Sequence, residues 1–245
     1  MINKKIRLIE LFGGVGTQAM ALHDLAVVNG LNPEDVYEKY RLVELDKYPV
    51  KSYNAVHGTN FEPMDITKIS GEDLGIVDKN DFVYFLTYSF PCQDLSLAGK
   101  QAGMDKGAET RSGLLWEVER LLNEVDNLPD YLIMENVTQV HGKKNIHNFG
   151  AWISFLESKG YHNYWQDLEA SQYGIPQHRN RTFMISSLED ISYEFPRTIP
   201  LNKIMRDMLD EHVDEKFYIS NDKANALIKK LIEDGKLDEE SVLAS

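Results

Sequence analysis

The chain has 245 residues, of which 42% are hydrophobic and 27% charged, a composition typical of a globular protein. Its apolar runs are too short to cross a bilayer and no cleavable signal pattern follows Met1, so we expect a cytoplasmic protein without membrane contact. The formal net charge of −13 argues against a free-standing nucleic-acid binder, because phosphate contacts require lysine and arginine. If nucleic acid is the substrate, the basic surface is either local or supplied by another polypeptide.

Apolar runs that suit buried strands alternate with segments of helical periodicity. The predicted strands are residues 6–11, 40–45, 82–86, 131–134, 161–168 and 182–186. The predicted helices are residues 17–28 and 48–57, a segment around 114–122, and a segment around 152–156 that ends before Gly160. This alternation indicates a three-layer α/β domain with a mostly parallel sheet.

The character of the sequence changes after residue 187. Pro196 and Pro200 interrupt the pattern, and residues 206–245 contain 11 acidic and 6 basic side chains. Helix-like stretches remain near 204–209 and 224–232. We expect residues 1–187 to form the main domain and residues 188–245 to form an acidic C-terminal extension.

A glycine-rich turn, Phe12-Gly13-Gly14-Val15-Gly16, joins the first predicted strand to the first predicted helix. Glycines there let the backbone turn tightly and approach a ligand at the helix N-terminus. Glu44 stands at the end of the next strand, where an acid can bind a pair of ribose hydroxyls. Together they indicate a nucleoside cofactor; the alternative is a tight turn beside a solvated acid.

Cys92 is the single cysteine of the chain and lies in Pro91-Cys92-Gln93, after the predicted strand 82–86. One cysteine excludes an internal disulfide, and we expect no metal site. A lone cysteine is usually inert and buried. Here, however, it follows a strand end, where parallel sheets bind ligands, and the glycines after it suggest a mobile loop.

Two further motifs surround the last predicted strands. Glu135-Asn136-Val137 follows the run 131–134, and its carboxyl group can hold or donate a proton, unless it only caps a helix. Arg179 and Arg181 alternate in an extended segment and therefore point the same way. Two guanidinium groups on one face suit a phosphate or an oxyanion, although a solvated edge strand is the alternative.

In order and identity, these four motifs resemble the signatures of the DNA cytosine-5 methyltransferase family over about residues 6–186. One departure is Thr17, where many relatives carry another glycine. The resemblance implies a three-layer Rossmann-like fold that uses S-adenosylmethionine, with a mostly parallel sheet and an antiparallel final strand.

The resemblance also implies a mechanism on double-stranded DNA. Cys92 would attack C6 of a flipped-out cytosine, Glu135 would share a proton at N3, and C5 would take the methyl group. Arg181 would hold O2, and Arg179 would support the nucleophile or a phosphate. The implied cofactor contacts are Phe12, Gly14, Gly16, Glu44, Asp65, Ile66 and Leu114. The implied substrate contacts are Pro91, Gln93, Ser96, Asn136, Val137 and Gln177.

The family's later segments, which are a target-recognition region, an arginine-rich motif and a C-terminal Gly-Asn-Ser/Ala-Val motif, have no match in this sequence. The resemblance therefore suggests the larger subunit of a split enzyme, whose second polypeptide supplies target recognition and the last motif. A truncated gene is the rival explanation. Two other functions stay open, namely a non-catalytic module that binds S-adenosylmethionine or DNA, and an RNA cytosine-5 methyltransferase.

Overall fold

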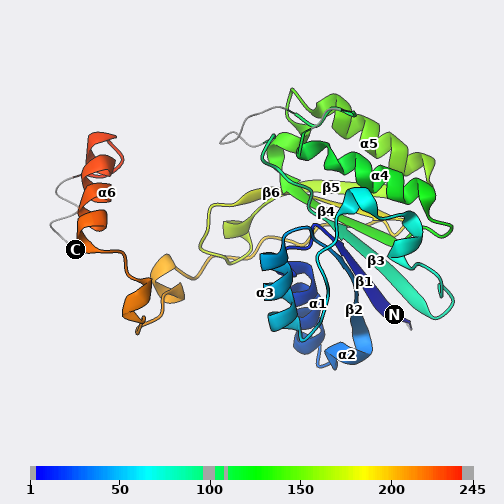
Figure 1. Ribbon diagram of the computed structural model, residues 1–245, viewed down its shortest axis with the longest axis horizontal. Helices are drawn as coiled ribbons and strands as arrows, with labels where there is room; N and C mark the ends of the chain where they lie inside the picture. Colours follow the sequence, from blue (N-terminus) through cyan, green and yellow to red (C-terminus); the bar gives the residue numbers. More distant parts are fainter. Residues whose placement is uncertain (1–3, 96–102, 108–109, 239–245) are drawn as a thin grey trace. The chain divides into compact units, whose positions relative to one another are not determined.

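The computed structural model describes residues 4–95, 103–107 and 110–238, in two compact units, Met1–Asn202 and Lys203–Ser245. The first unit has a six-stranded sheet with helices on both faces (Figure 1). Its strands are β1 (Lys5–Leu11), β2 (Tyr37–Val43), β3 (Phe82–Tyr88), β4 (Tyr131–Val137), β5 (His162–Glu169) and β6 (Asn180–Ser187). Its helices are α1 (Thr17–Val28), α2 (Pro33–Val36), α3 (Lys47–His57), α4 (Leu115–Glu124) and α5 (Ile146–Ser158).

The sheet has the order β2-β1-β3-β4-β6-β5. β1 pairs in parallel with β2 and β3, and β3 pairs in parallel with β4. β6 lies between β4 and β5 and runs antiparallel to both. The predicted topology, mostly parallel with an antiparallel final strand, is thereby confirmed.

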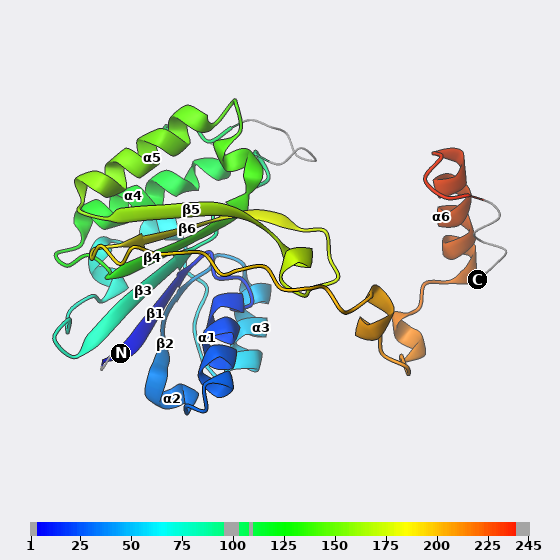
Figure 2. The same cartoon turned by 180° about the vertical axis from the view of Figure 1, so that it is seen from behind.

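The side chains of β1 alternate between the two faces of the sheet, as strand geometry requires. Ile6 and Leu8 pack in one cluster with Ala19 of α1. Ile9 belongs to the larger cluster on the other face, which includes the fully buried Trp152 of α5. Figures 1 and 2 show α1, α2 and α3 covering one face and α4 and α5 the other, so the predicted three layers are present.

Local sequence features explain the boundaries of α3 and β2. The Asp46 side chain accepts a hydrogen bond from the Tyr48 amide and caps α3, and Gly58, with φ 65°, ends it. The strand predicted at 40–45 instead covers residues 37–43. Its early start follows the short helix α2, and it ends before Glu44, whose carboxylate accepts the Asp46 amide and turns the chain out of the sheet.

After β6 the chain returns along the domain. Ile199 forms a parallel bridge with Tyr173, which lies in the loop before β6. The Ile199 amide donates to the Gln172 carbonyl at 2.8 Å, and the Tyr173 hydroxyl donates to the Pro196 carbonyl at 3.2 Å. The segment that follows β6 is therefore tied to the loop that precedes it.

The second unit holds two 3₁₀ turns, Met205–Met208 and Glu215–Phe217, and helix α6 (Asn221–Glu233). Both helix-like stretches predicted from the sequence are therefore helical. None of its described residues, 203–238, is buried. Across the described ranges of the whole chain, no helix is both long and apolar enough to cross a bilayer.

Glu10 is a carboxyl group fully buried beneath the glycine-rich turn. The Tyr53 hydroxyl donates to Oε2, whereas Oε1 has no hydrogen-bond partner among the described residues. Burial raises the pKa of Glu10 from 4.5 to about 7, because the charged form loses its hydration. Folding therefore becomes less favourable as pH rises from the unfolded pKa to the folded one, since the folded chain holds a proton that the unfolded chain has released.

We expect the Glu10→Gln variant to lose this pH dependence. Between about pH 5 and pH 8, Glu10 should lower the wild-type free energy of unfolding by on the order of 3 kcal/mol relative to that variant. Denaturant titrations followed by fluorescence will measure it, since Trp116, Trp152 and Trp165 all lie in the first unit. In the exposed-site variant Glu194→Gln, the free energy of unfolding should change with pH as it does in the wild type. If the free energy of unfolding of Glu10→Gln changed with pH as in the wild type, Glu10 would have the same pKa in the folded and the unfolded chain.

Candidate functional site

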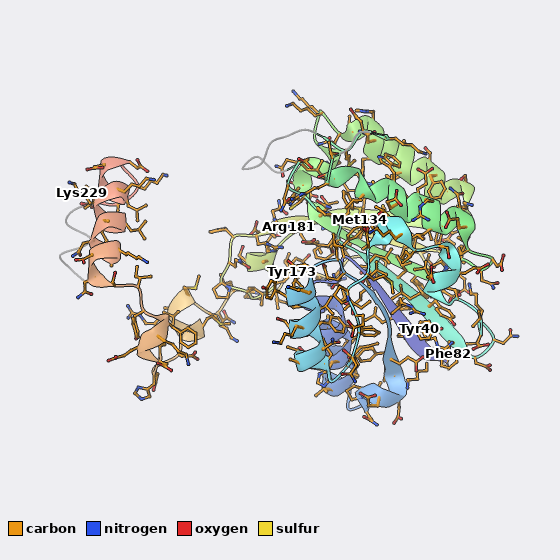
Figure 3. All side chains as sticks on the ribbon, in the orientation of Figure 1. Tyr40, Phe82, Met134, Tyr173, Arg181 and Lys229 are labelled. Carbon is orange, nitrogen blue, oxygen red and sulfur yellow. The ribbon has the colours of Figure 1, made fainter. Side chains whose placement is uncertain are left out.

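Four predicted motifs meet at one edge of the sheet. β1, β3 and β4 are parallel, and the register pairs Leu11 with Tyr88 and Tyr88 with Met134, so the loops that follow them leave the same edge. Because β6 is antiparallel, its first residues arrive at this edge as well. Figure 3 shows Arg181 and Tyr173 at the end of the sheet opposite Phe82, the first residue of β3.

The glycine-rich turn has an unusual backbone. Phe12, Gly14 and Gly16 all have positive φ, at 56°, 56° and 80°. A left-handed phenylalanine is strained, and such residues persist where the surroundings hold them, often at ligand sites. The Glu44 carboxylate holds the turn from one side, since Oε2 accepts the Gly14 amide at 3.1 Å. The predicted cofactor acid is thus part of the turn's support.

A cavity of about 540 Å³ opens beside this turn. Five predicted cofactor residues line it, and Gly14 and Gly16 shape the adjoining turn. The lining residues are Phe12, Val43, Glu44, Leu45, Asp46, Pro49, Met64, Asp65, Ile66, Ser89, Pro91, Gln93, Arg111 and Leu114. Hydrogen bonds from the Thr67 side chain and amide lower the pKa of Asp65. The cavity therefore offers carboxylate acceptors between apolar walls.

The Pro91-Cys92-Gln93 loop borders this cavity. Cys92 is half-buried against the larger core cluster, and its two neighbours line the cavity. Segment 111–112 anchors the loop: the Ser112 hydroxyl donates to the Pro91 carbonyl at 2.7 Å, and the Arg111 guanidinium to Gln93 Oε1 at 2.6 Å. The predicted substrate residue Ser96 lies outside the described residues.

Asn136 links the cysteine loop to β4. It is buried, and its side-chain amide donates to the Phe90 carbonyl at 3.0 Å, two residues before Cys92. Its own Oδ1 accepts the Val137 amide at 2.9 Å, and Val137 is buried in the core. The first contact gives Asn136 a role in holding the loop, and the contact of both residues with substrate stays a prediction.

Glu135 lies beside the two predicted arginines. Arg179 Nη2 and Arg181 Nε approach Glu135 Oε1 at 3.4 Å and 3.2 Å, so both side chains point the same way, as predicted. They border a recess of about 260 Å³ lined by Glu135, Leu168, Ala170, Tyr173, Arg179, Arg181 and Phe183. Gln177 is exposed in the loop before β6. The recess combines one carboxylate, two cations and aromatic walls.

Some residues that support the site were not predicted from the sequence. Asp94 is buried and accepts the amides of Arg111 and Ser112 at 2.8 Å and 3.3 Å. Nothing in the sequence around this acid, two residues after Cys92, predicts that its side chain is buried. Tyr53 and His57 contact the glycine-rich turn, and their signal was spacing: they follow Pro49 at intervals of four residues, on one face of α3.

Comparison with known proteins identifies relatives of this chain. A family model described as C-5 cytosine-specific DNA methylase matches residues 6–240. The type II methyltransferase M2.ScrFI of Lactococcus lactis subsp. cremoris is 46% identical over 146 residues, which cover 59% of this chain and 40% of that protein. The orphan methyltransferase M.SssI of Spiroplasma monobiae is 32% identical over an alignment that covers 89% of this chain and 68% of that protein.

Solved structures share the fold. The Entamoeba histolytica methyltransferase EhMeth superposes with a TM-score of 0.68 at 20% identity, covering 90% of this chain and 64% of that one. The S. pombe Dnmt2 methyltransferase has a TM-score of 0.62, also at 20% identity, with the same coverage. The chain thus spans between 40% and 68% of the length of these relatives.

The cavity fits S-adenosylmethionine, the cofactor that this family implies. Glu44 and Asp65 offer carboxylate oxygens to hydroxyl, amino or cationic groups, and Phe12, Ile66 and Leu114 offer apolar contact to a purine. Gly14, whose amide donates to the cavity residue Glu44, also leaves the backbone of the turn open, since an added Cβ atom there would meet no other atom within 4 Å.

We expect Glu44→Gln to weaken S-adenosylmethionine binding by roughly 10- to 100-fold, as for loss of a hydrogen bond to a charged group. The change removes the negative charge that accepts the Gly14 amide and faces the cavity. Isothermal titration of the full chain will measure the affinity. The exposed-site variant Glu62→Gln should bind as the wild type does. Equal affinities for Glu44→Gln and wild type would remove Glu44 from the cofactor site.

Proposed function

Because the chain belongs to the family of C-5 cytosine-specific DNA methylases, we propose that it transfers a methyl group to C5 of cytosine in DNA. The observation that carries the proposal is the position of the Cys92 loop. One side of this loop borders the cavity that fits the cofactor, and Asn136 ties it to the strand that presents Glu135 and the two arginines.

The proposed chemistry begins with a covalent bond. The Cys92 thiolate adds to C6 of cytosine, and the electron pair of the C5–C6 bond moves toward C5 and the ring. Glu135 shares a proton with N3 and so stabilises the negative charge of the adduct. Arg181 holds O2, and Arg179 supports Glu135 or a phosphate. Both arginines already contact Glu135, which supports their placement around one ring.

The second half of the reaction restores the aromatic ring. S-adenosylmethionine supplies an electrophilic methyl group, which C5 of the adduct accepts. A base removes the proton from C5. The electron pair of the broken C5–H bond then re-forms the C5–C6 double bond, and the Cys92 thiolate leaves C6. The products are 5-methylcytosine and S-adenosylhomocysteine, so the thiolate is regenerated at the end of each cycle.

The target base must leave the DNA helix, since C6 of a stacked cytosine cannot reach a side chain at a sheet edge. Unstacking costs a few kcal/mol, which contacts in the site must offset. The recess beside Glu135 supports this step, because Tyr173 and Phe183 offer aromatic walls next to polar groups. We propose that it receives the flipped ring; Pro91 lines the neighbouring cofactor cavity, so its contact with the ring stays a prediction.

We also propose that a second polypeptide supplies target recognition and the last family motif. The chain matches 40% and 68% of the length of the two curated relatives. The charge of −13 supports a partner that carries most of the basic DNA surface. In this proposal residues 1–187 are the catalytic domain, and residues 188–245 begin the linker toward target recognition.

Cys92→Ser should abolish methyl transfer, with a loss of roughly three orders of magnitude or more for a missing nucleophile. The variant keeps the cofactor cavity, so its affinity for S-adenosylmethionine should match the wild type. Transfer of labelled methyl groups to DNA measures the first quantity. Duplex DNA with 5-fluorocytosine tests the bond itself, because fluorine blocks release and traps the adduct on a denaturing gel. Persistent transfer by the serine variant would contradict the covalent mechanism.

The chain alone should methylate DNA slowly and without sequence preference, and a polypeptide that carries a target-recognition region should restore both rate and specificity. Matched assays with and without that polypeptide, on DNA and on RNA, measure this. Full sequence-specific activity of the purified chain would refute the partner. Transfer to RNA in place of DNA would favour an RNA methyltransferase, and cofactor binding without transfer in any arm would favour a non-catalytic module.

A further inference from the structure

One face of α3 is turned toward the glycine-rich turn. Pro49, Tyr53 and His57 recur every four residues and therefore share this face. Pro49 lines the cofactor cavity, whereas the ring of Tyr53 is only 1% exposed and His57 is half-buried. The N-terminal part of α3 thus forms a wall of the cavity, and its later residues Tyr53 and His57 lie against the glycine-rich turn.

Both rings contact the turn closely. With its proton on Nε2, His57 donates to the Val15 carbonyl, 3.1 Å away, and its ring packs on Tyr53 with centroids 4.4 Å apart. A Cβ atom added at Gly16 would lie 2.3 Å from His57 Nε2 and 2.5 Å from Tyr53 Cε2. The space at Gly16 is therefore taken by these two side chains.

The Tyr53 hydroxyl fixes the position of its ring. It donates to Glu10, a buried residue of β1 that lies two residues before Phe12. The contact joins α3 directly to the strand from which the turn emerges. Glu10, Tyr53 and His57 together, called the clamp here, hold the turn from below, while Glu44 holds Gly14 from the side.

The turn needs such support because its conformation is costly. Phe12, Gly14 and Gly16 all lie in the left-handed region, and Phe12 lacks the freedom of glycine. A free turn would populate other conformations, and the cofactor would then bind only the competent fraction. We propose that the clamp residues Glu10, Tyr53 and His57 are positioning residues that keep the glycine-rich turn in its cofactor-binding shape. The proposal rests on the proposed function only in assigning the cavity to S-adenosylmethionine.

Two changes test the clamp in the full chain. Tyr53→Phe removes the hydroxyl and keeps the ring, and His57→Leu removes the donor to Val15. The matched control is Tyr48→Phe, the same change at a tyrosine of α3 that is 69% exposed and outside the cavity. His57→Gln keeps a side-chain donor and serves as the conservative rescue. The probe is S-adenosylhomocysteine, measured by isothermal titration, together with amide hydrogen exchange of the segment 10–20.

We expect Tyr53→Phe and His57→Leu each to raise the Kd by roughly 3- to 20-fold, as for loss of one hydrogen bond that supports the competent state. Exchange should accelerate in segment 10–20, while amides of β3 and β4 stay protected as in the wild type. Tyr48→Phe should match the wild type in both measurements. His57→Gln should recover most of the affinity lost in His57→Leu.

The exchange measurement decides the proposal even for a chain that binds cofactor weakly. Unchanged exchange in segment 10–20 of both clamp variants overturns the proposal. Acceleration spread evenly over β3 and β4 also overturns it, since that pattern indicates general loss of stability. If Tyr53→Phe does not fold, the two His57 variants still decide. Neither measurement involves DNA or methyl transfer, so a chain that binds cofactor but methylates nothing contradicts the proposed function and leaves the clamp intact.

Discussion

The pairing of β3 with β1 and β4 is the constraint on which the candidate site depends. Parallel strands in this register end together, so the glycine-rich turn, the Cys92 loop and Glu135 emerge within one edge. The reversed direction of β6 adds Arg179 and Arg181, which precede or begin their strand, to the same edge. Four segments far apart in sequence thereby reach one edge of the sheet.

The sequence predicted this arrangement largely because its signals are local. Short apolar runs marked the buried strands, and glycine, cysteine and arginine stood immediately beside them. In a sheet of this class, position at a strand end translates directly into position at the ligand edge. The antiparallel last strand came from the family resemblance, and the structure confirms it. The start of β2 was missed, because α2 is a single capped turn with little periodicity.

Contacts between distant side chains could not be predicted in the same way. Asn136 stays a predicted substrate contact, but its buried side-chain amide also donates to the Phe90 carbonyl, a contact that the sequence did not predict. Asp94 caps the segment that anchors the Cys92 loop, and Tyr53 reaches Glu10 from another layer. Each contact depends on how helices and strands pack and on which side-chain rotamer fits between them. The spacing of residues along the chain predicts neither. Sequence patterns therefore predicted which segments meet at the sheet edge, but not the side-chain contacts that hold those segments.

The return of the chain after β6 determines where the first unit ends. β6 itself carries the backbone away from the reactive edge, yet the bridge between Tyr173 and Ile199 brings it back beside the recess of Glu135. The last residues of the first unit thus lie close to this recess, since Ile199 stands three residues before Asn202. Under the proposed function, the segment that leads toward target recognition therefore begins next to the recess that would receive the base.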